Sequence, residues 1–414
     1  MALAGVALLL SMVSAAEAGI NVWTSQDIGH TDNVLVVPGT PSTLYAVDSS
    51  IDFANFHKSS DSGNTWSLVA RVGFPILALA ADPVTPTTLY AGTQAYDEDT
   101  SRVSKSTDAG VTWSAADSGL SGITGRVGNV YALAVDPLNT DTLYAGTDQG
   151  VFKSTDGGAA WSMANAGLPS FFRIEAVAIA IDPFTPTTLY VGYYGTNTDG
   201  ASYTFGVSKS TDGAVTWTAA EAGLPDVSGN PLVIDPCTPT TLYTGASGDV
   251  FKSTDGGATW HASNTGVPGG GFVSALAVDP RTPSTVYAAT FSGGVSKSTD
   301  SGVNWSPLNI GLDDPSGLDR HYFIVWALAI DPFGPSTLYA AALDLYSIQE
   351  AAVCVGNCHG AEEVAINDVI TLVNIALGSA PPATCADGGL PIGGEVDISV
   401  IIDAVNNTLA GCNR

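Results

Sequence analysis

The chain alternates short apolar runs with turns rich in Gly, Pro, Asp and Thr. One stretch, at 133–137, reads LAVDP and leads through a short turn to TLYAG at 142–146. Short apolar runs bounded by turn residues are typical of β-strands, and the small side chains of the first run suit a crowded inner strand. The pair recurs roughly every 50 residues, which predicts four-stranded units in series. Its tyrosines are Tyr45, Tyr90, Tyr144, Tyr190, Tyr243, Tyr287 and Tyr339.

A second motif begins with Lys, ends with Trp and falls between the third and fourth strands of each predicted unit. Its first copy, at 58–66, reads KSSDSGNTW. In such a turn Asp accepts hydrogen bonds from backbone N–H groups, Gly adopts positive φ, and Trp returns the chain to a packed strand. We call it the Lys–Trp motif. Its six copies are Lys58–Trp66, Lys105–Trp113, Lys153–Trp161, Lys209–Trp217, Lys252–Trp260 and Lys297–Trp305.

The regularity of this motif supports two interpretations. All six lysines of the chain occupy its first position, which indicates a structural duplication rather than six functional lysines. The fourth copy carries Gly213-Ala214, which reverses the usual order of a larger residue followed by Gly. Because a non-Gly residue resists positive φ, a distorted turn is predicted there.

The two motifs differ in number, because seven tyrosine strands accompany only six Lys–Trp motifs. The segment 21–24 reads NVWT and precedes the first inner strand as the other Trp strands precede theirs. We therefore expect residues 20–26 to complete the last unit by strand exchange, so that the ring closes without open edges. Trp326 is assigned to the inner strand of that unit. The prediction for 19–350 is an all-β, seven-bladed β-propeller.

The Lys–Trp motif resembles the Asp-box, or bacterial neuraminidase repeat, found in sialidases, sortilin-type propellers and some xyloglucan hydrolases. The resemblance covers the propeller repeats and implies a secreted β-propeller. It also implies that the motif lies at the periphery, on the face away from the usual ligand site. The motif residues are therefore not candidates for catalysis.

The composition changes at 351–414, where four cysteines fall in a short stretch. Two segments, 366–377 and 398–407, have apolar residues at helical spacing. Their duplicated loop-plus-helix plan resembles a dockerin-type module with EF-hand-like loops. The resemblance implies a small α-helical C-terminal domain. A protein-docking module and a degenerate appendage that caps the propeller both remain open.

The loops of this module lack most calcium ligands. Ligand positions of the first loop hold Asn357, His359 and Ala361, and those of the second hold Gly389 and Pro391. Calcium needs about six or seven oxygen atoms, so at most weak calcium binding is expected. Disulfides are the more suitable staple for so small a fold, and four cysteines allow three pairings. The candidates are Cys354, Cys358, Cys385 and Cys412.

Charge and targeting narrow the class of partner. Acidic residues outnumber basic ones by 40 to 13, and a formal charge of -27 disfavours nucleic acid and anionic membranes. Residues 1–18 contain an apolar run and end in Ala16-Glu17-Ala18, which predicts a signal peptide and a mature start near Gly19. No later apolar stretch reaches about 18 residues, so no membrane span is expected. A secreted or cell-surface monomer is predicted.

Ligand residues of a propeller are expected at the channel mouth, in loops that enter inner strands and loops between second and third strands. The long insertions of this chain fall in those two loop classes. Arginines there can hold a carboxylate or sulfate by bidentate contacts, or can pair locally with loop acids. The candidate ligand-binding residues are Tyr96, Asp97, Arg102, Arg126, Phe172, Arg173, Tyr194, Tyr203, Arg320, His321 and Tyr322.

No catalytic or metal residue is assigned. A sialidase-like site needs three arginines, a tyrosine and a glutamate, but Phe172-Arg173-Ile174 lies mid-chain and is followed by Glu175. A xyloglucanase-like site implies paired aspartates between two propellers, and one propeller is predicted here. The five histidines and Cys237 show no metal spacing, so no cofactor is expected.

The sequence thus favours a secreted binding or scaffold propeller for a glycan or protein ligand. The alternative is a glycoside hydrolase acting on extracellular polysaccharide. A third interpretation, an export-linked assembly factor, rests on resemblance to single-propeller assembly proteins of photosynthetic membranes.

Overall fold

The structure is a computed structural model that describes most of the propeller. The described residues are 22–37, 39, 42–49, 53–94, 102–120, 128–170, 173–196, 203–225, 231–246, 248–268, 271–291, 293–312, 324–331 and 337–349. The predicted signal peptide, the C-terminal module at 351–414 and its four cysteines lie outside them, so these stay predictions. Every regular element within the described ranges is a β-strand.

The strands form seven four-stranded antiparallel sheets, which are the seven predicted blades. Blade 1 contains β2–β5, blade 2 β6–β9, and blade 3 β10–β13. The bounds in blades 1 to 3 are β2 Asn33–Val37, β3 Thr43–Ser49, β4 Ala54–Ser59, β5 Ser67–Val72, β6 Ile76–Ala81, β7 Leu89–Thr93, β8 Val103–Ser106, β9 Ser114–Ala115, β10 Val130–Val135, β11 Leu143–Thr147, β12 Gly150–Ser154 and β13 Ser162–Met163.

Blade 4 contains β14–β17, blade 5 β18–β21, and blade 6 β22–β25, whereas blade 7 combines β26–β28 with β1. The bounds are β14 Arg173–Ile181, β15 Leu189–Thr196, β16 Tyr203–Ser210, β17 Thr218–Ala219, β18 Leu232–Ile234, β19 Leu242–Ala246, β20 Asp249–Ser253, β21 His261–Ala262, β22 Val273–Val278, β23 Val286–Thr290, β24 Gly294–Ser298, β25 Ser306–Pro307, β26 Ala327–Asp331, β27 Thr337–Ala341, β28 Leu345–Gln349 and β1 Thr24–Ser25.

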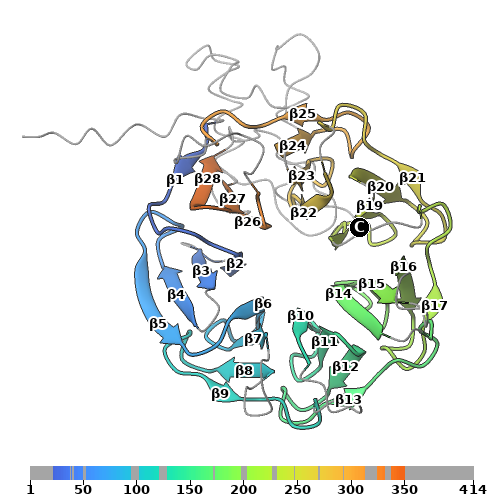
Figure 1. Ribbon diagram of the computed structural model, residues 1–414, viewed down its shortest axis with the longest axis horizontal. Helices are drawn as coiled ribbons and strands as arrows, with labels where there is room; N and C mark the ends of the chain where they lie inside the picture. Colours follow the sequence, from blue (N-terminus) through green and yellow to red (C-terminus); the bar gives the residue numbers. More distant parts are fainter. Residues whose placement is uncertain are drawn as a thin grey trace, which may run out of the picture.

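The blades are arranged as a ring around a central axis (Figure 1). The first strand of each blade faces the axis, and the fourth strand lies at the rim. Side chains of neighbouring sheets pack between the blades, where the repeat tyrosines are almost completely buried. Burial of these tyrosine side chains and of the adjacent Leu, Val and Ala residues supplies the main stabilisation of the propeller.

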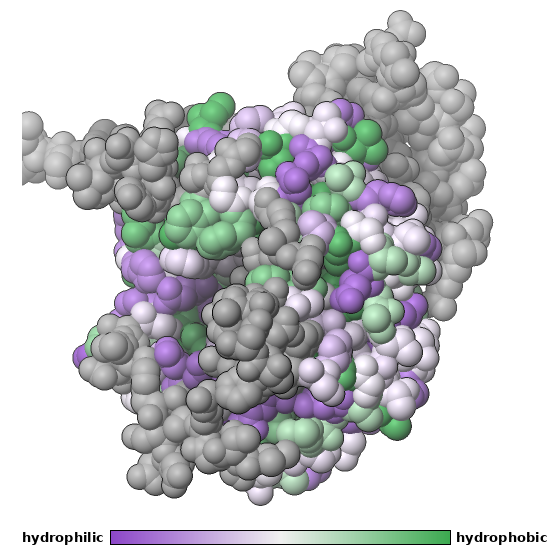
Figure 2. Space-filling model, turned by 45° about the vertical axis from the view of Figure 1, so that its right-hand side comes forward, coloured by the Kyte–Doolittle hydropathy of each residue, from purple (hydrophilic) through white to green (hydrophobic). Residues whose placement is uncertain are grey.

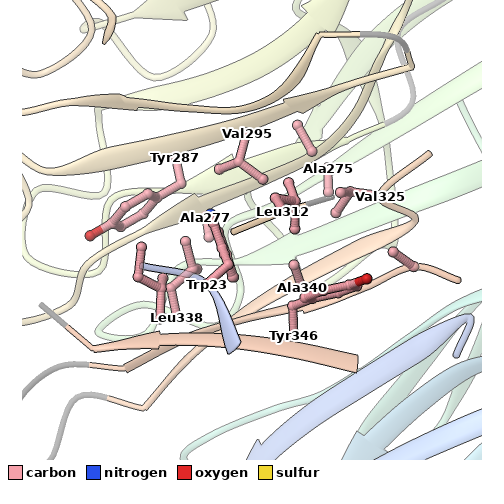
Figure 3. Packing of buried hydrophobic residues seen from close by; sticks show 13 residues of the cluster. Trp23, Ala275, Ala277, Tyr287, Val295, Leu312, Val325, Leu338, Ala340 and Tyr346 are labelled. Atoms are coloured by element: carbon pink, nitrogen blue, oxygen red, sulfur yellow. The ribbon is translucent and has the colours of Figure 1, made fainter. Parts of the chain in front are cut away.

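The N-terminal strand closes the ring, as the sequence predicted. In blade 7, β1 pairs antiparallel with β28, with Thr24 opposite Ser347 and Ser25 opposite Tyr346. The preceding Trp23 is 3% exposed and packs against residues of blades 6 and 7, among them Leu338 (Figure 3). We call β1, with Trp23, the closing strand.

Trp23 occupies the same position in blade 7 that the motif tryptophans occupy in other blades. Its backbone N–H donates to the Ile310 carbonyl at 2.9 Å, and its indole N–H donates to the Leu308 carbonyl at 2.6 Å. Trp305 makes the equivalent pair of bonds with Thr265 and Ser263 of blade 5. The strand exchange therefore restores a complete seventh copy of the interblade contact.

Each Lys–Trp motif is held by its aspartate. In blade 5, Asp255 Oδ1 accepts from the Ser253 hydroxyl at 2.8 Å and the Thr259 backbone N–H at 2.9 Å, while Oδ2 accepts from the Thr259 hydroxyl at 2.6 Å. The Ser253 hydroxyl oxygen in turn accepts from the Gly257 N–H at 2.9 Å. The turn thus satisfies its polar groups locally, and the expected role of the aspartate is confirmed.

The predicted distortion of the fourth copy is wrong. Gly213 and Ala214 have φ values of 73° and 65°, so Ala214 adopts the left-handed conformation that Gly has elsewhere. The Ala214 N–H still donates to the Ser210 hydroxyl at 2.9 Å, and Asp212 keeps its bonds to Thr216. Hydrogen bonding at both ends of the turn holds the alanine in a backbone region that it would otherwise avoid.

The motif lysines join neighbouring blades. Lys252 of blade 5 donates to the Ser301 carbonyl in the motif of blade 6 at 2.8 Å, and the hydroxyl of Tyr243 donates to the same oxygen at 3.1 Å. The ammonium also lies 5.4 Å from the centroid of the Tyr243 ring. Equivalent lysine-to-carbonyl bonds are Lys105 to Gly157, Lys153 to Gly213 and Lys209 to Gly256. The repeated lysine thus has a structural role.

The motif aspartates predict an acid-sensitive fold. Hydrogen bonds from threonine hydroxyl and backbone N–H groups lower the pKa of Asp108, Asp212 and Asp255 to about 2. Because the folded pKa lies below the unfolded value of about 3.9, their stabilisation is present above pH 4 and is lost as the pH falls toward 2. Urea midpoints measured from pH 6 to pH 2.5 should fall most steeply below pH 4. A variant with all three residues changed to asparagine should show a shallower fall, and an unchanged slope would contradict this assignment.

Candidate functional site

The strand order defines two faces of the ring. Inner strands begin, and second strands end, on one side, which we call the mouth face. The Lys–Trp motifs and the Asp-Pro turns that follow inner strands lie on the opposite side, which we call the motif face. Blade 1 shows this arrangement. Asn33 at the start of β2 pairs with Val47 near the end of β3, and Val37 at the end of β2 pairs with Thr43 at the start of β3. The ligand-binding candidates that the structure describes, which are Arg102, Arg173, Tyr194 and Tyr203, lie on the mouth face.

The structure describes four of the candidate ligand residues. Arg173 and Tyr203 are described only as backbone, where both pair with Thr196 at the mouth end of blade 4. The side chains of Arg102 and Tyr194 are described as well. The candidates outside the described residues are Tyr96, Asp97, Arg126, Phe172, Arg320, His321 and Tyr322.

Tyr194 belongs to an aromatic pair at the mouth end of blade 4. Its ring lies 5.7 Å from that of Phe205 on the neighbouring strand, with the ring planes inclined by 37°. On the other side, Tyr194 lies opposite Glu175 in the strand register. The adjacent Tyr193 donates to Glu221 Oε2 at 3.1 Å, and burial, with the Glu221 charge, raises the pKa of Tyr193. This blade therefore combines aromatic rings with one buried acid, Glu175, and one half-buried acid, Glu221.

Arg102 lies at the junction of blades 2 and 3. Its backbone N–H donates to Asp117 Oδ2 at 2.8 Å, and its side chain is half-buried. A Cβ atom at Gly128 would lie 3.9 Å from Arg102 Cδ and 3.2 Å from Asp148 Oδ1. Arg102 and Asp148 therefore both lie near Gly128, where blade 2 meets blade 3.

A larger aromatic surface covers blades 6 and 7 and was not predicted from the sequence. The rings of Phe272 and Phe291 lie 4.9 Å apart at 47°, and the Phe291 N–H donates to the Phe272 carbonyl at 3.0 Å. Trp326 precedes β26 and is 44% exposed, although it was assigned to the inner strand itself. Leu343 follows β27 and is 42% exposed. We call these four residues the aromatic patch.

Backbone contacts hold the two halves of the patch together. The Ser274 hydroxyl donates to the Val325 carbonyl at 2.6 Å, which ties the start of β22 to the residue before Trp326. The Trp326 N–H donates to the Ala341 carbonyl at 2.8 Å, which places the tryptophan beside the loop that carries Leu343. The exposed rings of Phe272 and Trp326 are thus both fixed at strand ends.

A cavity of about 390 Å³ with an apolar lining lies in the central channel among the inner strands of blades 4 to 7. Its lining includes Leu232 and Leu328 together with Pro236 and Pro280 of the Asp-Pro turns, so the cavity lies toward the motif face. The inner strands β2, β6, β10, β18 and β22 carry no charged residue, whereas β14 contains Arg173 and Glu175 and β26 ends in Asp331. The charged residues of the described inner strands therefore belong to blades 4 and 7.

Hydrophobic and hydrophilic residues are interspersed over the face of the molecule in Figure 2. The motif face also exposes apolar side chains on its Asp-Pro turns, such as Phe184, which is 48% exposed. Exposure alone therefore does not mark a binding site. The aromatic patch differs in that it combines the Phe272–Phe291 ring pair of blade 6 with the exposed Trp326 of the neighbouring blade 7.

Blade 1 carries a second polar cluster on the mouth face. His30 Nε2 lies 3.6 Å from Asp32 Oδ1, and His30 Nδ1 lies 3.7 Å from Asp48 Oδ1. Nearby, the Arg71 guanidinium lies 3.6 Å from the centroid of the Phe53 ring. Sequence spacing gave no indication of the His30 cluster, because Asp48 reaches it only through the pairing of β2 with β3.

Comparisons with known proteins agree with the fold. No family model matches the chain, and no curated protein matches it. Among solved structures, a GH74 xyloglucanase from Xanthomonas campestris is 16% identical with a TM-score of 0.53, and the match covers 77% of this chain and 59% of that enzyme. YCF48 bound to D1 peptide is 14% identical with a TM-score of 0.54, with 79% and 94% covered. A chain of the COPII outer coat vertex is 10% identical with a TM-score of 0.57, with 77% and 83% covered.

These likenesses show a seven-bladed β-propeller and no more, since identities this low do not carry function. The chain spans less than two thirds of the xyloglucanase. No helix among the described residues is long and apolar enough to cross a membrane.

Proposed function

We propose that the protein is a secreted binding or scaffold propeller that holds a glycan or protein ligand against the aromatic patch. One observation carries the proposal: Phe272, Phe291 and Trp326 present rings from two adjacent blades on the mouth face. Flat, rigid aromatic side chains supply large contact areas at small entropic cost, and they dominate binding energy at many interfaces.

The ligand chemistry follows from the surroundings of the patch. The rings offer apolar faces, so a ligand with apolar faces of its own, such as a pyranose ring or an aliphatic side chain, matches them. The net charge of -27 disfavours polyanionic ligands. Two ligand-binding candidates from the sequence, the half-buried Arg102 in blade 2 and Arg173 in blade 4, supply cationic groups that could each bind a single carboxylate or sulfate.

Matched phenylalanine variants test the proposal on a glycan array probed with the full-length protein. Phe272→Ala and Trp326→Ala should each weaken binding at least about tenfold, because each removes an exposed ring of the patch. Phe184→Ala, which removes a similarly exposed ring from the motif face, should leave binding unchanged. Absence of binding to every glycan would exclude a glycan ligand. Equal binding by all three variants would place the site elsewhere.

A glycoside hydrolase is the alternative. Retaining glycosidases place two carboxyl groups about 5–5.5 Å apart, and the ligand oxygens of Asp32 and Asp48 lie within 4.8 Å of each other. However, the His30 ring contacts both of those oxygens, and a substrate oxygen would have to displace it. We therefore expect no release of reducing ends from xyloglucan or other β-glucans. Release that disappears in Asp48→Asn would favour the hydrolase.

An export-linked assembly factor is the third candidate function. The match to YCF48 covers 94% of that chain, whereas the match to the xyloglucanase covers 59% of that enzyme. A single propeller offers one binding face rather than a cleft between two. A protein ligand is therefore the second choice if the glycan array is negative.

A further inference from the structure

We propose that His30, Asp32 and Asp48 form a binding site for a divalent transition-metal cation at the seam between blades 7 and 1. One ligand atom from each of the three side chains can be chosen so that all lie within 4.8 Å of one another. His30 and Asp32 belong to the segment between β1 and β2, and Asp48 belongs to β3. The site goes beyond ligand binding at the aromatic patch and does not depend on it.

Both carboxylates are oriented by a donor on the oxygen that faces away from His30. Asp32 Oδ2 accepts from the Ser49 backbone N–H at 2.7 Å, and Asp48 Oδ2 accepts from the Asn55 amide at 3.0 Å. The Oδ1 atoms of Asp32 and Asp48 are therefore the oxygens that face the imidazole of His30. Donors that fix the outer oxygen of a ligating carboxylate are a regular feature of metal sites, because they hold the inner oxygen in place.

The electrostatics of the cluster favour an added cation. The Asp32 and Asp48 Oδ1 atoms lie 3.6 Å and 3.7 Å from the two ring nitrogens of His30, so two carboxylates stand beside a single imidazole. A divalent cation would balance the charge of both carboxylates and take one ring nitrogen of His30 as a ligand.

His57 is a further nitrogen donor close to the cluster. It lies opposite Ala46, two pairs along from Asp48 and Asn55 in the same two strands, so its side chain lies on the same face of the sheet as Asp48. Its approach would complete a site with two nitrogen and two oxygen ligands.

The donor set selects the kind of cation. Imidazole nitrogen with two carboxylates suits zinc and similar first-row ions, whereas calcium requires six or more oxygen ligands. The cation would also join two blades. The Thr31 N–H donates to the Ala342 carbonyl of blade 7 at 2.9 Å, and the Asp32 N–H donates to the Val47 carbonyl of blade 1 at 2.8 Å. Bound metal would therefore fasten the segment that follows the closing strand.

Titration of the metal-free full-length protein tests this site. Zn²⁺ followed by isothermal calorimetry, and Co²⁺ followed by its visible absorption, should each report one site. That site should be at least tenfold weaker in His30→Ala and in Asp48→Asn. His261→Ala, which removes an exposed histidine from β21 of blade 5, serves as the control and should bind as the wild type does.

Thermal unfolding provides the second readout. Saturating Zn²⁺ should raise the melting temperature of the wild type and of His261→Ala by several degrees, and that of His30→Ala by much less. Binding that persists undiminished in His30→Ala would overturn the assignment, as would the absence of binding. An equal effect of Ca²⁺ would also contradict it, because this donor set does not suit calcium.

Discussion

Replacing Trp23 by alanine is expected to lower the free energy of unfolding by about 3–5 kcal/mol, the largest effect of any single substitution considered. The indole is 3% exposed and packs in the cluster that joins blades 6 and 7, beside Val295, Leu312 and Leu338. Its removal leaves a cavity, and the Leu308 carbonyl loses a hydrogen-bond donor. Because this contact closes the ring, the loss acts on both blades at once. Urea unfolding followed by intrinsic fluorescence measures it.

Trp326→Ala is the matched control for this prediction. It removes the same side chain from a position that is 44% exposed, so the free energy of unfolding should change by less than about 1 kcal/mol. If the two variants lost equal stability, the closing strand would not have the role assigned to it. Limited proteolysis near residue 23 should also be accelerated in the first variant and not in the second.

Asp344→Ala should destabilise the protein by about 2–4 kcal/mol. Asp344 is buried in the loop before β28, where Oδ1 accepts from the N–H groups of Ile28 at 3.2 Å and Gly29 at 3.0 Å. Oδ2 accepts from the Asp27 N–H at 3.2 Å and from the Ser25 hydroxyl. One carboxylate therefore fixes the chain that leaves the closing strand. Its removal leaves those partly buried donors without an acceptor.

Asp249→Ala provides the comparison, because Asp249 precedes the first apolar residue of the third strand in blade 5, as Asp344 does in blade 7. In blade 5 the fourth strand, β21, follows the third strand directly in the sequence, whereas the fourth strand of blade 7, β1, comes from the N-terminal segment. Blade 5 therefore needs no carboxylate to hold its fourth strand in place. Urea midpoints should therefore show a large loss for Asp344→Ala and a small one for Asp249→Ala. Similar losses would mean that the carboxylate has only a local turn role.

The fold was predictable because its information is repeated. The tyrosine strands and the Lys–Trp motifs mark each blade independently, so their unequal number was enough to assign Trp23 to blade 7. The error at Ala214 has a different origin, since conformational preference is a local property. There the hydrogen bonds of the surrounding turn outweigh the cost of positive φ for alanine.

The candidate site was less predictable because it depends on contacts between blades. Long insertions drew attention to residues such as Tyr194, whereas Phe272 stands in a loop without marked insertion and Trp326 was assigned to the inner strand that follows such an insertion. Their proximity follows from the bond between Ser274 and Val325, which no local pattern indicates. The His30 cluster likewise depends on strand register, since Asp32 and Asp48 are brought together by the pairing of Asn33 with Val47.

Photo-crosslinking from matched positions tests the central claim, that ligand binds on the mouth face, most directly. A photoreactive phenylalanine analogue is placed at Phe272 in one sample and at Phe184 in another, and each is irradiated with the glycan or protein that the wild type binds. The account predicts a ligand crosslink from position 272 on the mouth face and none from position 184 on the motif face. A crosslink from position 184 alone would contradict it.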